Sequence, residues 1–463
     1  MTSAARLGPA DLTLTGRFEK AHERRYAHVP FDVPAGVHQL HIRYAYSEQI
    51  DSDPLVGGGN TLDIGLFDER GTAEGSPGFR GWSGSNKMDL TIDERWATPP
   101  YRAGPIGAGR WHVLLGPYKV GPRGCDWTVE VWFDPGLSSP PRRTGATRRR
   151  DPETPPEARK GWLRGDLHCH TLYSDGDSWP AEMLHAAAEA GLDFLGVTDH
   201  NNVAHQLAYG PGGDGLPIVV PGIEVTTYGG HWNAWGTDRW WEFREPDTAA
   251  VERTMRAAIE SGAVVSICHP KPFGPPWEYA NDGGFHAIEV WNGPWRQLNA
   301  ASLARWDALL RRGVRCAAVG GSDTHYLRRR DVSERHADAI GTPTTWVAAD
   351  RTVGSILAAL REGRSFISRS PRGPQMYLEA HPAARDAAAL EVRGGEGATV
   401  RVVDDSGVIA TDTVASAHWD RAFDLRAGSP YVRAELLSPD GEVLALTNPL
   451  WSREIVDAPE GRG

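Results

Sequence analysis

The sequence is poor in cysteine, in long apolar runs and in excess positive charge. Only four cysteines occur in 463 residues, and none forms a CxxC pair, so a disulfide framework is not expected and a reducing compartment is favoured. No apolar run approaches the length of a transmembrane helix, and the N-terminus lacks the regions of a signal peptide. The net charge of −11 disfavours anionic membranes, and nucleic acids other than nucleotide-sized substrates. We therefore expect a cytoplasmic protein that acts on a small molecule; nothing indicates its oligomeric state.

The chain is longer than one hydrophobic core usually supports, since single cores rarely exceed roughly 250–300 residues. Residues 1–135 alternate apolar and polar side chains between Gly- and Pro-rich turns, which predicts an N-terminal β-sandwich. Residues 136–160 form a Pro- and Arg-rich linker. Residues 161–378 alternate strand and helix patterns, and residues 379–463 return to strand alternation. The last segment predicts a small C-terminal β-domain.

The middle region shows repeated strand–helix units. Helical patterns cover residues 179–190, 249–261, 298–312 and 352–362, and a glycine follows each of them. Glycine is the residue that most often ends a helix, because it adopts the left-handed conformation without strain. Repeated units of this kind predict parallel strands covered by helices, and so an α/β fold.

Metal-binding side chains stand at the ends of five predicted strands. In the segment GDLHCHTLYSDG (165–176), side-chain alternation puts Asp166, His168 and His170 on one side of a strand. In an α/β barrel the carboxyl ends of all strands meet at one face, so the groups of different strands are expected to lie together. The four other strands end in the following residues: His200, Glu224, His269, and the pair Asp323 and His325.

This combination of imidazole and carboxylate groups predicts a metal centre. It is the ligand set expected for Mn, Fe or Zn, whereas Mg prefers oxygen ligands alone. Without metal, each unsatisfied buried polar group would cost about 1–3 kcal/mol, so a chance cluster is disfavoured. Cys169 and Cys268 alternate away from the ligand face, which argues against a thiol nucleophile. We expect Asp166 and Asp199 to orient the histidines, as metal sites generally require.

The motifs DxHxH at 166–170, Thr-Asp-His-Asn at 198–201, Gly-Ile-Glu at 222–224, Cys-His-Pro at 268–270 and Gly-Ser-Asp-Thr-His at 321–325 resemble the PHP family (polymerase and histidinol phosphatase). The stretch GHWNAWG at 230–236 and the flanking regions resemble its carbaryl-hydrolase-related branch. The resemblance implies a distorted seven-stranded (β/α)7 PHP barrel flanked by the two β-domains.

The resemblance also implies which residues hold two or three divalent ions. The implied sets are His168, His170, Glu224 and Asp323 for the first ion, Glu224, His231 and His269 for the second, and Asp175, His200 and His325 for the third. Many relatives carry histidine where Asp175 stands, so the identity and the occupancy of the third ion are left open.

A metal-activated water is expected to attack the substrate. His200, His325 and Asp323 are the predicted catalytic residues, and either histidine, if not metal-bound, could instead protonate the leaving group. For substrate binding, Lys271 and Arg328 favour a phosphate. Trp232 and Trp277 lie near the ligand segments and suggest a partly aromatic substrate.

The sequence thus predicts a metal-dependent hydrolase of small-molecule esters, with phosphoesters favoured. Two alternatives remain open. One is a carbamate or carboxylic ester hydrolase that uses the same metal site. The other is a non-catalytic metal-binding scaffold, which the full set of candidate ligands disfavours.

Overall fold

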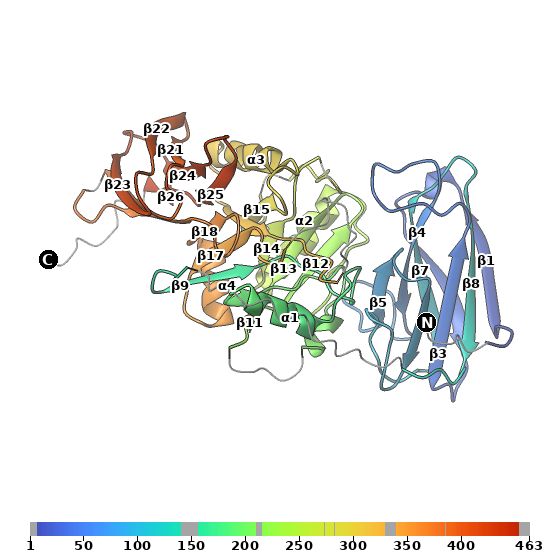
Figure 1. The fold of residues 1–463 in the computed structure, drawn as a ribbon. Helices are drawn as coiled ribbons and strands as arrows, with labels where there is room; N and C mark the ends of the chain where they lie inside the picture. The colour runs from blue at the N-terminus through green and yellow to red at the C-terminus, as the bar shows by residue number, and fades with distance from the viewer. Residues whose placement is uncertain are drawn as a thin grey trace.

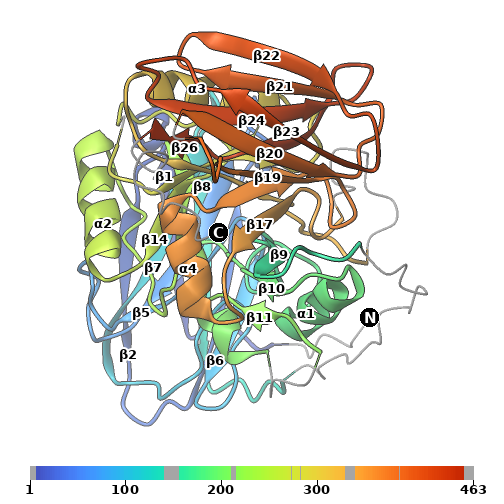
Figure 2. The same ribbon diagram turned by 90° about the vertical axis from the view of Figure 1, so that its left-hand side faces the viewer.

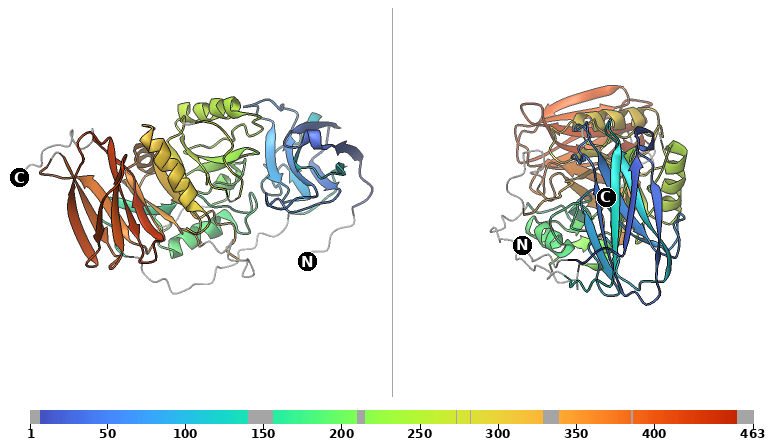
Figure 3. Two further views of the ribbon diagram at one scale, coloured as in Figure 1. Left: turned by 90° about the horizontal axis from the view of Figure 1, so that it is seen from above. Right: turned by 90° about the vertical axis from the view of Figure 1, so that its right-hand side faces the viewer.

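The computed structural model describes residues 7–139, 156–209, 215–272, 274–281, 283–328, 339–384 and 386–452. The N-terminal strands, the α/β middle region and the C-terminal strands lie in a row (Figure 1), and the view from above shows the same order (Figure 3). Most of the predicted linker at 136–160 lies outside the described residues. Within the described ranges, no helix is both long and apolar enough to cross a membrane.

The N-terminal region consists of two four-stranded antiparallel sheets, with strand orders β1-β8-β3-β6 and β2-β7-β4-β5. Alternate side chains of β3 in one sheet and β4 in the other, Leu40, Ile42, Ile64 and Leu66, are buried in one core shared by both sheets, because strand side chains point to alternate faces. The strands are β1 (Leu12–Phe18), β2 (Ala27–Val33), β3 (Gln39–Tyr46), β4 (Thr61–Phe67), β5 (Phe79–Gly84), β6 (Asp89–Asp93), β7 (Gly109–Lys119) and β8 (Cys125–Phe133).

The middle region contains two groups of strands rather than one closed barrel. Strands β9, β10 and β11 are parallel, as are β14, β15 and β16, but β12 and β13 form an antiparallel hairpin. Isolated parallel bridges, Cys169 to Thr324 and His200 to Glu224, connect the two groups at their carboxyl ends. The strands are β9 (Trp162–Asp166), β10 (Phe194–Leu195), β11 (Ile218–Val219), β12 (Gly222–Thr227), β13 (Gly230–Trp235), β14 (Val264–Ile267), β15 (Ala287–Asn292) and β16 (Ala317–Gly321).

The predicted (β/α)7 barrel is therefore not confirmed. Continuous pairing among the described strands stops at the two isolated bridges. The described residues contain four α-helices, which surround the middle strands (Figure 2): α1 (Pro180–Glu189), α2 (Thr248–Glu260), α3 (Asn299–Arg311) and α4 (Val353–Glu362). Their ends agree with the glycine signals; Gly363, for example, caps α4 with a φ of 72°.

The C-terminal strands continue a sheet of the middle region. β17 pairs with both β9 and β18, and β18 pairs with β25, so one sheet runs from β11 to β22. The predicted boundary at 378/379 falls inside β19, which needs residues on both sides of it to pair with β20. The strands are β17 (Thr344–Ala348), β18 (Ser365–Ser368), β19 (Gln375–Ala380), β20 (Ala387–Arg393), β21 (Thr399–Asp404), β22 (Gly407–Thr413), β23 (His418–Asp424), β24 (Tyr431–Leu437), β25 (Val443–Thr447) and β26 (Leu450–Trp451).

Aromatic side chains join the N-terminal region to the middle region. The rings of Phe79 and Trp240 are 4.6 Å apart, and Tyr26 stacks on Tyr228 at 4.8 Å. The Tyr228 hydroxyl donates a hydrogen bond of 2.8 Å to Oδ2 of Asp63, and burial raises the pKa of Asp63 to about 7. The joint thus combines aromatic contacts with polar ones.

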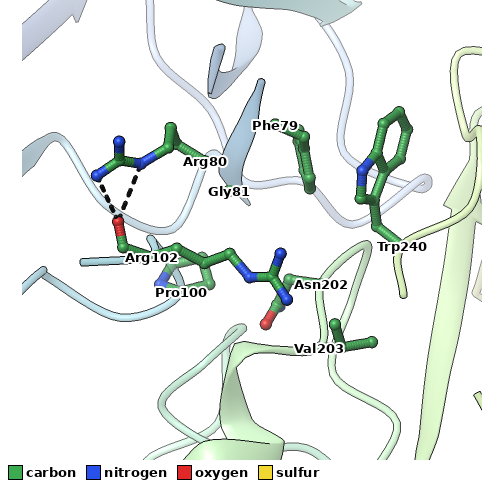
Figure 4. Close-up of a pocket in the computed structure, with 8 residues that line it drawn as sticks. All are labelled: Phe79, Arg80, Gly81, Pro100, Arg102, Asn202, Val203 and Trp240. Atoms are coloured by element: carbon green, nitrogen blue, oxygen red, sulfur yellow. Dashed lines mark hydrogen bonds between the residues drawn. The ribbon is translucent and has the colours of Figure 1, made fainter. Parts of the chain in front are cut away.

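A small recess lies at this joint. It is lined by Phe79 and Arg102 from the N-terminal region and by Asn202 and Trp240 from the middle region (Figure 4). Its volume of about 10 Å³ accommodates roughly one water molecule. The recess is therefore a gap in the packing between the two regions and is too small to hold an organic substrate.

Candidate metal centre

The structure brings all nine predicted metal ligands together. They stand at or just beyond the carboxyl ends of β9, β10, β14 and β16, on the β12–β13 hairpin, and in the turn after His170. Among the described residues, several sets of potential ligand atoms lie within 4.8 Å of one another. The sets relevant to the predicted ligands are His170, Asp175, His200 and His325; His168, Glu224 and His269; His168, His170 and Asp323; and His200, Glu224 and His231.

Glu224 lies at the middle of the cluster and faces different histidines with its two oxygens. Its Oε2 is 3.2 Å from Nε2 of His168 and 3.3 Å from Nε2 of His170. Its Oε1 is 3.0 Å from Nδ1 of His231 and 3.3 Å from Nε2 of His269. Nδ1 of His200 is a third imidazole atom near Oε2, at 3.0 Å. A carboxylate with imidazoles at both oxygens is arranged to bridge two ions.

Several ligand atoms in this cluster are buried without a hydrogen-bond partner. They are Nε2 of His168, Nε2 of His170, Oδ1 of Asp175 and Oε2 of Glu224. A buried polar atom without a partner costs about 1–3 kcal/mol, and these atoms come from residues that share the ligand sets described above. Divalent cations would satisfy all of them, and the nitrogen and oxygen donors suit Mn, Fe or Zn. The residues present therefore fit a metal centre.

The Asp175 set forms the exposed rim of the cluster. Oδ1 of Asp175 is 3.3 Å from Nε2 of His325 and 3.6 Å from Nε2 of His200. The side chains of Asp175 and His325 are 40% and 21% exposed, whereas that of His168 is fully buried. The ring of His170 stacks between those of His200 and His325, at 4.4 and 4.2 Å. Asp175 has the most exposed side chain among the candidate ligands.

The charges of the cluster favour ionised carboxylates, but they leave the imidazoles in different protonation states. Burial, together with His325 and His200, lowers the pKa of His170 to about 4, so this imidazole is neutral. Burial works against ionisation of Glu224, yet the surrounding imidazoles hold its pKa well below the ordinary value. Burial also opposes a charged His325, but Asp175 outweighs it and the pKa of His325 is raised to about 10. Without an ion, the rim thus holds one proton between His325 and Asp175.

Glu289 orients His168, and sequence reasoning missed it. Its Oε1 accepts a hydrogen bond of 3.0 Å from Nδ1 of His168, which turns Nε2 toward the cluster. Its Oε2 accepts bonds from the backbone N–H of His269 at 3.0 Å and from Nδ2 of Asn292 at 3.2 Å. A signal was present, because a buried glutamate in the apolar strand AIEVWN is unusual.

Asp166 acts on the backbone rather than on an imidazole ring. Its Oδ1 accepts from the backbone N–H groups of His168 and Ser322, both at 3.1 Å, and its Oδ2 accepts from Gly341 at 2.7 Å. Asp166 therefore holds the backbone of His168 and joins the segments that follow β9 and β16.

Asp199 acts on His170 through Ser174. The Ser174 hydroxyl donates a bond of 2.6 Å to Oδ1 of Asp199. The same hydroxyl oxygen is 3.3 Å from Nδ1 of His170 and can accept a hydrogen bond from this nitrogen. These two hydrogen bonds leave Nε2 of His170 to face the cluster, as a metal ligand requires.

Backbone strain and a close packing contact accompany the ligands. His269 and Asp323 have φ values of 27° and 54°, in the left-handed region that costs non-glycine residues about 1–3 kcal/mol. A Cβ atom on Gly321 would stand 2.4 Å from Cβ of His168. Only glycine therefore lets the end of β16 approach the DxHxH segment this closely.

Three of the four predicted substrate contacts do not agree with the structure. Lys271 is 2% exposed, and its Nζ donates to the backbone oxygen of Asn292 and to Oδ1 of Asn299, at 2.8 and 3.1 Å. Trp232 and Trp277 are 0% and 8% exposed and belong to the apolar core. Lys271 instead satisfies polar groups at the end of β15 and the start of α3, and the tryptophans pack the core.

Arg328 lies beside the rim, but its charge is compensated. Its guanidinium donates to Glu182, and its backbone N–H donates to Oδ2 of Asp177 at 3.0 Å. Its side chain is 38% exposed. Arg328 therefore ties the segment after β16 to α1 and is less suited to bind an anion.

Comparison with known families agrees with the PHP resemblance. Residues 166–244 match the family model described as "PHP domain". His269, Asp323 and His325 lie beyond the matched segment. This match does not confirm the resemblance to the carbaryl-hydrolase-related branch.

Two curated proteins are similar over short segments. The chain is 37% identical over 68 residues to the 5'-3' exoribonuclease Rnm of Escherichia coli, covering 13% of this chain and 22% of that protein. It is 39% identical over 64 residues to the phosphoribosyl 1,2-cyclic phosphate 1,2-diphosphodiesterase of Eggerthella lenta, covering 14% and 24%. The chain thus spans about a quarter of the length of these relatives.

Two solved structures are also similar in part. A two-domain protein from Bacteroides vulgatus, described as containing a predicted PHP-like metal-dependent phosphoesterase, is 18% identical, with a TM-score of 0.36, and covers 66% of this chain and 100% of its own. An amidohydrolase from Chromobacterium violaceum is 16% identical, with a TM-score of 0.24, and covers 35% and 88%. Neither similarity is strong enough to carry a functional argument.

Proposed function

We propose that this chain is a metal-dependent hydrolase of the PHP type that cleaves phosphoesters. The position of Glu224 carries the proposal: its Oε1 faces two imidazoles and its Oε2 faces three, and ligand atoms on both His168 and His170 lack a hydrogen-bond partner. The match of residues 166–244 to the PHP domain supports it. Both curated relatives are named for the cleavage of phosphodiesters, which favours phosphorus over carbon esters.

In this proposal three sets of residues would hold the ions. Bound divalent ions supply activation of water near neutral pH and neutralise the charge that grows on the substrate oxygens. The proposed sets are His168, His170, Glu224 and Asp323 for one ion, Glu224, His231 and His269 for a second, and Asp175, His200 and His325 for a third at the rim.

His325 has a second role in this proposal. Its Nδ1 is 2.7 Å from the backbone oxygen of Asp323 and donates to it, which directs Nε2 to Asp175 at 3.3 Å. When no third ion is bound, the proton between His325 and Asp175 lies at the rim, where a leaving group would depart. His325 is then placed to protonate it.

In this proposal the substrate is a small anionic ester. The protein acts on it in a reducing compartment. All four cysteines lie in described segments, are buried and form no disulfide, which supports that compartment. The net charge of −11 supports a small substrate rather than a nucleic-acid strand.

A substrate panel tests the proposal. Protein reconstituted with Mn, Fe or Zn is assayed with p-nitrophenyl phosphate, bis(p-nitrophenyl) phosphate, an aryl carbamate and p-nitrophenyl acetate. Glu224→Gln serves as the control, because it keeps the shape of the side chain but removes the bridging charge. Turnover of a phosphate ester that Glu224→Gln abolishes supports the proposal. Preference for the carbamate or acetate supports carbon-ester hydrolysis instead, and no turnover by metal-loaded protein supports a scaffold.

A further inference from the structure

The turn between β5 and β6 reaches across the joint to the metal-ligand turn. Nδ2 of Asn86 donates to the backbone oxygen of Ser174 at 2.9 Å, and Nζ of Lys87 donates to the same oxygen at 3.1 Å. β5 is the N-terminal strand that lies toward the middle region in Figure 1. Ser174 directly precedes Asp175, so the N-terminal region contacts the peptide that carries a rim ligand.

Lys87 carries its charge into this joint without a close ionic partner. Burial lowers the pKa of Lys87, while the charges of Asp175 and Asp199 act in the opposite direction. Within the part of the chain that the structure describes, no carboxylate lies within salt-bridge distance of Nζ, and the Ser174 oxygen is its acceptor. An ammonium group has three N–H donors, so donor capacity remains. Withdrawing such a charge from water is unfavourable unless an anion meets it.

Two other cations of the described residues, both predicted to bind a phosphate, already have partners. The guanidinium of Arg328 is paired with Glu182. Nζ of Lys271 donates to Asn292 and Asn299 in the interior. Of these three positive side chains, Lys87 alone combines a position next to the exposed rim with the absence of a compensating carboxylate.

We propose that Lys87, supplied by the N-terminal region, binds a non-bridging oxygen of the substrate phosphate at the rim formed by Asp175 and His325. This inference rests on the proposed function and assigns to the site the recognition of anionic esters. The contact also gives the N-terminal strands a role in substrate selection, because the position of Lys87 depends on the docking at Ser174. A charge-assisted hydrogen bond of this kind is among the stronger polar contacts available to a protein.

Four variants separate anion binding from docking. Lys87→Met removes the charge and keeps most of the side-chain length, and Lys87→Arg keeps the charge. Asn86→Ala removes the other donor to Ser174 without changing the charge. Lys20→Met is a matched control, because Lys20 is an exposed lysine of the same region that is paired with Glu23.

The metal-reconstituted proteins are compared in steady-state kinetics with bis(p-nitrophenyl) phosphate and p-nitrophenyl acetate, and in calorimetric titration with inorganic phosphate. We expect Lys87→Met to raise KM for the phosphate ester, and Kd for phosphate, about ten- to a hundredfold, with kcat changed less than about threefold and metal content unchanged. Lys87→Arg should recover part of this loss. Asn86→Ala, Lys20→Met and all acetate reactions should change less than about twofold.

Equal losses in Lys87→Met and Asn86→Ala would show that Lys87 only docks the two regions, and would overturn the inference. An unchanged KM and Kd in Lys87→Met would overturn it as well. The proposed function fails separately: if wild-type protein binds phosphate through Lys87 but cleaves no phosphate ester, the inference stands and the assigned reaction does not. If wild-type protein neither binds phosphate nor cleaves its esters, both fail.

Discussion

Oε1 of Glu289 lies 3.0 Å from Nδ1 of His168 and so determines which ring nitrogen faces the candidate metals. The other carboxylate oxygen accepts the backbone N–H of His269, a ligand that follows a different strand. One buried side chain in β15 therefore positions ligands from both the DxHxH segment and the Cys-His-Pro segment.

Glu289→Gln is the first prediction. The amide still reaches His168, but its one oxygen cannot replace both carboxylate oxygens. A neutral partner also makes the imidazole ring less basic. Metal affinity should therefore fall roughly ten- to a hundredfold. Competition with a chelator measures the affinity. Glu379→Gln, at an exposed position of β19, is the control. Activity should return when metal is in large excess, and an unchanged affinity would contradict the orienting role.

The number of bound ions is the second prediction. Nine ligands are too many for one ion of four to six ligands, so purified or reconstituted protein should hold at least two equivalents of transition metal. Elemental analysis after removal of free metal provides the measurement. A value of one or less after reconstitution with Mn, Fe and Zn in turn would rule out the bridging role of Glu224.

The third prediction concerns the ligands themselves. Asp323→Ala or His168→Ala should lower turnover at least about a thousandfold, because metal activation of water contributes several kcal/mol. Near-normal turnover in either variant would place the active site elsewhere. Near-ultraviolet circular dichroism should show that the fold is retained, since both residues lie in the cluster and outside the N-terminal core.

The clustering of most candidate ligands could be predicted from the sequence because these residues stand beside a local signal, whereas Asp175 and His231 were implied only by the family resemblance. An apolar strand followed by a histidine or an acid, as at His200 and His269, locates the carboxyl end of a strand without knowledge of its partners. The role of Glu289 depends on how close β15 comes to the segment after β9, and such long-range distances leave no local pattern. The same reason hides Lys87, which is 88 positions before Asp175 in the sequence.

The substrate contacts were predicted poorly for a related reason. Nearness in sequence to a ligand places Lys271 and Trp232 near the centre, but side-chain direction decides whether they face it. Lys271 turns to Asn292 and Asn299, and Trp232 enters the core. The continuous sheet through β18 and β25 was also missed, because pairing between strands that lie this far apart in the sequence is not encoded in their alternation.

Lys271→Met supplies the fourth prediction. Because Nζ bonds the end of β15 to the start of α3, its loss leaves the Asn292 oxygen and the Asn299 side chain with fewer partners, at a cost of about 1–3 kcal/mol. The free energy of unfolding, measured by urea denaturation, should fall by that amount. KM for phosphate esters should stay within about threefold of the wild-type value. A large rise in KM without loss of stability would restore Lys271 as a substrate contact.

The fifth prediction concerns Asp63. Burial raises its pKa in the folded protein to about 7, above the value of about 3.9 in an unfolded chain. The folded state therefore binds more protons between these values, and this contribution to stability is lost as the pH rises toward 7. Asp63→Asn keeps an oxygen for Tyr228 but does not titrate.

Urea denaturation at pH 5 and pH 8 tests this. From pH 5 to pH 8, wild-type protein should lose about 2–3 kcal/mol of stability relative to Asp63→Asn, which corresponds to roughly two pKa units. Equal pH dependence of the two proteins would mean that Asp63 is ionised at the joint. Asp32→Asn, at an exposed position in the same region, is the control.

The side chain of Asn448 completes the hydrogen bonding of two strands that lie far ahead of it in the sequence. Its Oδ1 accepts from the backbone N–H of Ala318 at 2.6 Å, and its Nδ2 donates to the oxygens of Ala318 and Ser365. Ala318 belongs to β16, the strand that leads to Asp323 and His325. During translation, the backbone groups of Ala318 and Ser365 that bond to Asn448 must wait until residue 448 has left the ribosome. An unpaired strand edge is prone to aggregate, so the edge of β18 that faces β25 stays open to other chains until residues 445–447 are available to pair with it.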